Sequence, residues 1–314
     1  MKIFATWMLG VAMSVLPMAS AGAWMERDVN RSGLYGTLVL PEGPNPVRAV
    51  LILSGSGPTD RNGNNPAGAN DSLKLVAHGL AAEGIASLRV DKRGIAASAG
   101  AGLREDDLRI ETYVTDAVAW LDFLRGELPQ SRVLLLGHSE GALIATLAAR
   151  RTDVAGLVLV AGAGESADRI IARQLAAGGA PDQLQAVSKR IAESLRKGQP
   201  VADVPTELLA LYRPSVQNYL MSWLPLDPAA ELARLTAPAL IVQGTHDLQI
   251  RVEDAQRLAA GPNSKFVLIE AMNHVLREAP KERAANLAIY GAFDKPLAPE
   301  LVPAIASFIE AHAR

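Results

Sequence analysis

Short, mainly apolar runs alternate along the chain with segments of helical periodicity, and this alternation restricts the possible folds more than any other feature. The runs are Arg48–Leu53, Ile85–Val90, Arg132–Leu136, Gly156–Val160, Ala239–Val242 and Lys265–Ile269. A short continuous apolar run is typical of a strand buried on both faces. Helices are predicted between and after these runs at Asp71–Glu83, Ile110–Leu124, Gly141–Arg150, Glu253–Ala260 and Pro299–Ala313. The order predicts an α/β fold with a mostly parallel central sheet and helices on both faces.

Two further segments complete the predicted architecture. Gly33–Leu40 alternates in a way that suits a strand at the edge of the sheet. The segment from Glu165 to about Leu235 has helical periodicity and several prolines but no strand pattern. Because open α/β sheets bind ligands at the carboxyl ends of their strands, we expect this insertion to form a helical cap over that edge. Residues 24–314 are therefore predicted to form a single domain with one inserted cap.

The first 23 residues differ from the rest of the chain. Lys2 precedes an apolar run, Ile3–Leu16, and two small-x-small triplets follow at Ala19–Ala21 and Ala21–Ala23. A retained membrane anchor is disfavoured because a spanning helix needs about 20 apolar residues. A charged start, a short apolar run and a cleavage site are typical of a signal peptide. Residues 1–23 are predicted to be a removed signal peptide, and the protein to be periplasmic or secreted, with no stable membrane insertion after cleavage.

Composition excludes several kinds of chemistry. The formal net charge of −2 leaves no basic surface of the kind that binds nucleic acid. The chain has no cysteine, so it has no disulfides and no cysteine-bound zinc, and its Asp, Glu and His residues show no metal-site spacing. Gly162–Ala167 matches a dinucleotide-binding fingerprint, but no strand ending in an acid follows about twenty residues later. No metal, other cofactor or nucleic-acid partner is therefore predicted.

The strongest chemical signal is Gly137–Gly141 (GHSEG), which lies between the strand Arg132–Leu136 and a predicted helix. Glycines on both sides permit a sharp strand-to-helix turn that lifts the serine hydroxyl clear of the sheet. The helix that begins there points backbone N–H groups and its positive dipole end toward the same place. The motif in this context predicts Ser139 as a nucleophile, whereas an ordinary turn of a ligand-binding protein is the alternative.

A serine nucleophile needs a base and an acid that orients the base. Of the five histidines, His274 directly follows the strand Lys265–Ile269, whereas His138 is expected to point away from Ser139. Asp247 directly follows the strand Ala239–Val242. All three residues thus lie at carboxyl ends of strands and occur in the order serine, aspartate, histidine. We predict that Ser139, Asp247 and His274 form a catalytic triad.

The oxyanion that forms during acyl transfer needs two N–H donors. We expect the backbone N–H groups of Glu140, directly after the nucleophile, and of Ser56, in the glycine-rich loop Ser54–Pro58, to supply them. In the inserted segment, Met221 and Trp223 are predicted to line the substrate pocket, where a thioether and a broad ring accommodate acyl chains. The alternative is that this apolar stretch packs the cap onto the body of the protein.

These motifs resemble the α/β-hydrolase superfamily over about Val47–Leu276, cap included. Asp91–Gly94 (DKRG) and Ser54–Asn64 are similar to the serine esterase and lysophospholipase-like branch, which includes serine aminopeptidase-like hydrolases, although the usual leading His-Gly is Ser54-Gly55 here. The resemblance implies that Asp91 and Arg93 hold loops near the site.

The predicted function is hydrolysis of small-molecule carboxylic esters through an acyl-enzyme on Ser139. An aminopeptidase or amidase of the same fold, with Glu165 or Asp168 binding a substrate amine, is an alternative. A non-catalytic secreted binding protein is a second alternative.

Overall fold

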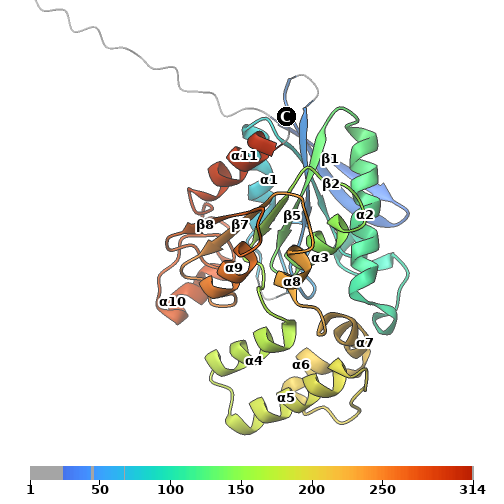
Figure 1. The fold of residues 1–314 in the computed structure, drawn as a ribbon, viewed down its shortest axis with the longest axis vertical. Helices are drawn as coiled ribbons and strands as arrows, with labels where there is room; N and C mark the ends of the chain where they lie inside the picture. Colours follow the sequence, from blue (N-terminus) through green and yellow to red (C-terminus); the bar gives the residue numbers. More distant parts are fainter. Residues whose placement is uncertain (1–23, 44–45, 67, 313–314) are drawn as a thin grey trace, which may run out of the picture.

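The computed structural model describes residues 24–43, 46–66 and 68–312 (Figure 1). The predicted signal peptide, residues 1–23, lies outside the described residues, so export stays a prediction. No helix within the described ranges is long and apolar enough to cross a membrane.

Eight strands form one mixed sheet in the order β1-β2-β4-β3-β5-β6-β7-β8. Their bounds are β1 Trp24–Arg31, β2 Leu34–Pro41, β3 Arg48–Leu53, β4 Ala86–Val90, β5 Arg132–His138, β6 Leu157–Val160, β7 Ala239–Gly244 and β8 Ser264–Ile269. The six strands β4, β3, β5, β6, β7 and β8, in sheet order, run parallel to one another. Strand β2 pairs antiparallel with β4 on one side and with β1 on the other. The predicted mostly parallel central sheet is therefore confirmed, with all the continuous apolar runs as parallel strands.

The edge position predicted for Gly33–Leu40 is wrong. This segment forms β2, which pairs with β1 on one side and with β4 on the other. The edge strand is β1, which the sequence did not predict because four of its eight residues are charged and only Val29 is buried. Charged residues along an edge strand discourage pairing with other chains, so the hydrophobic pattern is weakest at this position.

Helices cover both faces of the sheet, as predicted (Figure 1). On one face α2 (Ile110–Glu127), α3 (Glu140–Ala149) and α9 (Val252–Ala259) contribute to a core cluster with apolar side chains of the strands. On the other face α1 (Ser72–Ala82) and α11 (Leu301–His312) contribute to a second cluster. The remaining short elements of the body are α10 (Arg283–Ala288) and the 3₁₀ turns η1 (Ala96–Gly100), η2 (Glu105–Asp107) and η4 (Ile289–Gly291).

A run of helices separates β6 from β7, in the segment predicted to be a cap. It consists of α4 (Ala167–Ala177), α5 (Asp182–Arg196), the 3₁₀ turn η3 (Thr206–Leu208), α6 (Leu209–Tyr212), α7 (Pro214–Trp223) and α8 (Pro228–Leu232). Figure 1 shows α4 to α7 grouped beyond the end of the sheet, with α8 closer to the body. The helices α4, α5 and α7 share a separate apolar cluster around Leu195, Leu208 and Tyr212. We call α4–α8 the inserted helices.

Candidate active site

The nucleophile candidate lies at a sharp turn between β5 and α3. Ser139 has φ 55° and ψ −121°, a conformation that is uncommon for a residue with a side chain. The turn is tight enough that a Cβ on Gly137 would lie 2.1 Å from the carbonyl oxygen of Gly141, and one on Gly141 would lie 2.4 Å from that of Leu53. Only glycine fits at either position, which is why the motif has the spacing that the sequence shows.

The base and acid candidates are already paired. His274 Nδ1 lies 2.8 Å from Asp247 Oδ2, and the two side chains are 7% and 1% exposed. Since an ionised carboxylate only accepts hydrogen bonds, His274 donates through Nδ1 and keeps Nε2 as an acceptor. Asp247 is held from its other side by the backbone N–H groups of Gln249 and Ile250, at 2.7 and 2.9 Å.

The charge on Asp247 is stabilised despite its burial. Burial alone raises the pKa of this carboxyl, but the His274 ring and the two backbone N–H groups oppose the shift and lower the pKa below its usual value. Asp247 is therefore ionised throughout the neutral range, as a residue that orients a histidine must be.

His138 does not point away from the site, which corrects the sequence prediction. Its Nε2 donates to the backbone oxygen of His274 at 2.9 Å, and the two rings lie 4.9 Å apart. Burial and the neighbouring His274 lower the pKa of His138 to about 3. A neutral ring that binds the backbone of His274 thus lies next to the candidate base. The sequence hid this role because a residue flanking the nucleophile is ordinarily directed to the other side of the strand.

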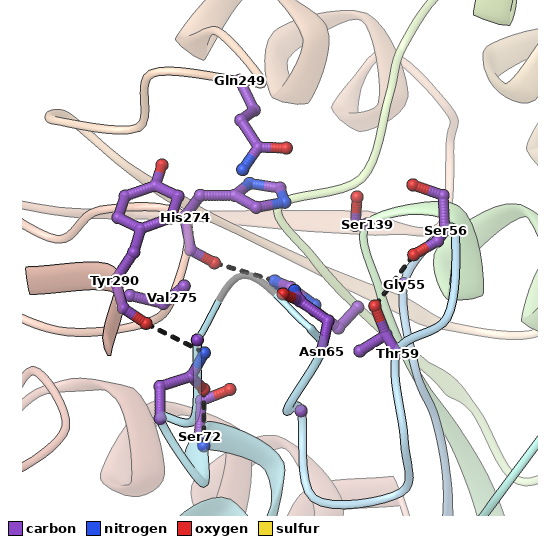
Figure 2. Close-up of a pocket in the computed structure, with 14 residues that line it drawn as sticks. Gly55, Ser56, Thr59, Asn65, Ser72, Ser139, Gln249, His274, Val275 and Tyr290 are labelled. Carbon is purple, nitrogen blue, oxygen red and sulfur yellow. Dashed lines mark hydrogen bonds between the residues drawn. The ribbon is translucent and has the colours of Figure 1, made fainter. Parts of the chain in front are cut away.

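Two cavities meet at Ser139. The polar cavity, of about 130 Å³, is lined by Ser139 and His274 together with Thr59, Asn65, Asn70, Ser72, Gln249 and Tyr290. The apolar cavity, of about 290 Å³, extends under the inserted helices and is lined by Ser139 together with Leu143, Ile170, Leu211, Val216, Leu220 and Trp223. Ser56 and Gln249 line both cavities. Figure 2 shows the Ser139 hydroxyl and the His274 ring facing the same space, with the Gln249 side chain beside the ring.

The loop expected to supply an oxyanion donor lies against the nucleophile. A Cβ on Gly55 would lie 3.1 Å from Ser139 Cβ, so the loop passes close to the serine. Thr59 fixes it by donating from Oγ1 to the backbone oxygen of Ser56 at 2.8 Å. The structure thus brings Ser56 and Glu140 to the same cavity as Ser139.

A buried charged group beneath this loop was not predicted from the sequence. Lys92 Nζ donates to the backbone oxygen of Gly55 and lies 3.6 Å from Glu140 Oε2, and its side chain is 8% exposed. Tyr219, from the inserted helix α7, donates to Glu140 Oε1 at 2.8 Å. Burial lowers the pKa of Lys92, an effect that the Glu140 carboxylate opposes. Lys92 belongs to the DKRG motif, where only Asp91 and Arg93 had been given a role.

Of the two predicted pocket residues, Trp223 lines the apolar cavity and Met221 does not. On α7, Val216, Tyr219, Leu220 and Trp223 line the apolar cavity, with the i, i+3, i+4, i+7 spacing of one helix face. Met221 lies off this face and packs with the apolar cluster of the inserted helices, which corrects its assignment to the pocket wall. Trp223 both lines the cavity and packs against two core clusters, so the two alternatives considered for it both apply.

Asp91 and Arg93 hold loops, as the resemblance implied. Asp91 accepts hydrogen bonds from the backbone and side chain of Arg61, and Arg93 binds the carboxylate of Asp116 and the backbone oxygen of Ala101. Within the described part of the chain, no group of three or more His, Asp or Glu side chains could hold a metal ion.

A twisted, mostly parallel sheet with helices on both faces and a serine at a strand-to-helix turn defines the α/β-hydrolase fold, and the predicted superfamily is confirmed. The chain belongs to the family described as serine aminopeptidase, S33, whose model matches residues 70–280. This range contains Ser139, Asp247 and His274 but begins after Ser56.

Among curated proteins, the chain is similar to esterase EstD of Thermotoga maritima, with 29% identity over 260 residues, 80% of this chain. The match covers 60% of that esterase, so the chain spans only part of its length. Among solved structures, it resembles Est1E of Butyrivibrio proteoclasticus with bound ferulic acid (TM-score 0.58, 17% identity, 91% of this chain and 98% of that one). It also resembles proline iminopeptidase of Mycobacterium smegmatis (TM-score 0.56, 16% identity, 92% and 99%). At these identities the two structures share the fold with this chain.

Proposed function

We propose that the protein hydrolyses carboxylic esters through an acyl-enzyme on Ser139. The observation that carries this proposal is the His274–Asp247 pair, which shares a cavity with a serine held at a strained turn. The similarity to esterase EstD supports an ester as the substrate. The apolar cavity beside Ser139 suits the acyl group of such an ester.

The reaction follows from the positions of these groups. His274 Nε2 takes the Ser139 proton as the hydroxyl oxygen bonds to the ester carbonyl carbon, and the N–H groups of Ser56 and Glu140 stabilise the resulting oxyanion. The carbon–oxygen bond to the alcohol then breaks, and the alcohol leaves with the proton from His274. Water attacks the acyl-enzyme in the same way, which releases the acid and restores Ser139. Asp247 stabilises the charged imidazole in both halves of the reaction.

An aminopeptidase activity, which the family description and proline iminopeptidase suggest, would need a free acid to bind the substrate amine. Glu165 lines the apolar cavity, but its carboxylate forms ion pairs with Arg169, Arg173 and Arg257. Asp168 pairs with Arg196. Acids already paired in this way compete poorly for an ammonium group, and this favours esters.

Hydrolysis of p-nitrophenyl esters and of aminoacyl p-nitroanilides by the same preparation tests the proposal. We expect kcat/KM for p-nitrophenyl butyrate to exceed that for every anilide. Faster cleavage of an aminoacyl anilide would reverse the choice between the two activities, and absence of both would favour the binding-protein alternative.

We expect activity to fall at low pH with the uptake of a single proton. The base must be unprotonated, whereas the lowered pKa of Asp247 and the pKa of about 3 for His138 keep both residues in one state above about pH 4. A plot of log kcat/KM against pH should therefore have an acid limb of slope 1. A slope of 2 would show that His138 or Asp247 titrates with the base and would contradict this assignment.

Lys92 is proposed as a positioning residue for the oxyanion site. The carbonyl that accepts its hydrogen bond is that of Gly55, and this carbonyl belongs to the same peptide group as the Ser56 N–H. Binding the carbonyl fixes the plane of the peptide and polarises the N–H. The same ammonium is paired with Glu140, whose N–H is the second donor.

Lys92→Met is expected to lower kcat by about 10²-fold with little change in KM, the order found on losing one oxyanion donor. The single change also leaves Glu140 buried without its cation, so we pair it with Lys92→Met/Glu140→Gln. The double variant should regain the wild-type melting temperature but not kcat. Recovery of both quantities would mean that Lys92 serves only to neutralise Glu140.

A further inference from the structure

The two cavities at Ser139 differ in chemistry and in their relation to the base. The larger is walled mainly by apolar side chains of α3, α4 and α7. The smaller combines hydroxyl, amide and imidazole groups with glycines and Val275. His274 lines the smaller cavity and is absent from the described lining of the larger one. This difference determines which part of an ester each cavity can hold, an inference that rests on the proposed function.

The general acid must reach the oxygen of the departing alcohol. His274 returns its proton to that oxygen, so the alcohol lies on the side of the site that His274 lines, which is the polar cavity. The acyl chain extends in the other direction from the carbonyl carbon, into the apolar cavity. The leaving group therefore occupies the smaller, polar space.

We propose that the polar cavity is a subsite for an uncharged, hydroxylated leaving group, such as a small polyol or a sugar. Its described lining contains no Asp, Glu, Lys or Arg, so a charged leaving group would be desolvated without a partner. A hydrocarbon leaving group would instead strip water from the hydroxyl and amide groups and return no hydrogen bonds. A group with several hydroxyls avoids both costs.

Two of the residues that line this cavity, Thr59 and Asn70, are held in place and keep hydrogen-bonding capacity for a ligand. Thr59 Oγ1 donates to the backbone of Ser56, which leaves its lone pairs available to a ligand hydroxyl. Asn70 accepts from the backbone N–H of Ser72 and donates one of its two amide hydrogens to the backbone oxygen of Tyr290, which leaves the other hydrogen. Figure 2 shows Gln249 and Tyr290 on the His274 side of this cavity. Rigid partners of this kind cost little to order on binding.

Three butyrate esters that differ only in the alcohol test the assignment: glyceryl 1-monobutyrate, propyl butyrate and butyrylcholine. Each kcat/KM is divided by the rate constant for hydroxide hydrolysis of the same ester, which removes differences in intrinsic reactivity. We expect the glyceryl ester to exceed both others by about tenfold or more, the order of one or two hydrogen bonds. Equal values, or preference for the propyl or choline ester, would overturn the inference.

Two variants separate the cavities. Thr59→Val removes the hydroxyl of a residue that lines the polar cavity and should reduce the glyceryl-to-propyl ratio. Loss of the Thr59 hydrogen bond to the Ser56 carbonyl slows the two esters alike, so the ratio reports the contact with the leaving group. The matched control Val216→Phe fills part of the apolar cavity and should change the preference between acetate and hexanoate esters, with an unchanged glyceryl-to-propyl ratio. If Val216→Phe alters the leaving-group ratio and Thr59→Val does not, the cavities have been assigned the wrong way round. Absence of all hydrolysis, p-nitrophenyl butyrate included, would instead contradict the proposed function itself.

Discussion

Ser139→Ala is expected to lower kcat by at least about 10³-fold without unfolding the protein. The three residues proposed as a triad act as one unit, so loss of the nucleophile removes nearly all the acceleration that they provide together. Alanine keeps the Cβ of serine, so the turn at φ 55° between Gly137 and Gly141 gains no new clash. The residual rate comes from binding and from the oxyanion donors alone.

Three measurements on the purified variant test this expectation: ester hydrolysis, melting temperature and labelling by a fluorophosphonate. The wild type should gain one covalent adduct, and the variant should gain none at an unchanged melting temperature. Ser194→Ala, on the remote helix α5, controls for loss of a serine hydroxyl and should label fully. A folded Ser139→Ala protein that keeps most of its activity would show that another residue is the nucleophile.

The parts of the fold that the sequence predicts well are those where one physical requirement dominates. The runs that became β3, β5, β6 and β7 are buried on both faces, and burial on both faces requires continuous apolar sequence. The turn at Ser139 was equally predictable, because two close backbone approaches exclude every residue except glycine. Strand β1 has no apolar sequence pattern that would predict a strand. This charged edge strand forms through its pairing with β2 and not through burial of its own side chains.

Contacts between residues far apart in the chain could not be predicted from the sequence. Lys92, Glu140 and Tyr219 belong to a loop, the start of α3 and the inserted helix α7, and each alone is an ordinary polar residue. Only the fold makes them a buried group beside the oxyanion loop. The same holds for Met221 and Trp223, since the rotation of α7 about its axis decides which of two neighbouring apolar side chains meets the cavity.

Asp247→Asn is expected to lower kcat by about 10⁴-fold, the size known for the equivalent change in the serine-protease template. The asparagine can keep the contacts of Oδ1 with the backbone N–H groups of Gln249 and Ile250. Its amide nitrogen then takes the place of Oδ2, which now accepts from His274 Nδ1 and from Gln243 Nε2. An N–H donor in that position stabilises the tautomer that carries its proton on Nε2, and this tautomer cannot accept the Ser139 proton.

The control for this change has to be an acid whose charge has no structural role. Asp254, only seven residues away in α9, is unsuitable because it is buried, binds Arg173 and accepts from the backbone of Gly164. Asp203 is exposed in the loop before α6, so Asp203→Asn should change neither kcat nor the melting temperature. The kinetics of both variants are measured with the same p-nitrophenyl ester at a pH above the acid limb. If Asp247→Asn kept more than about a tenth of wild-type kcat, His274 would need a different orienting acid and the assignment of Asp247 would be wrong.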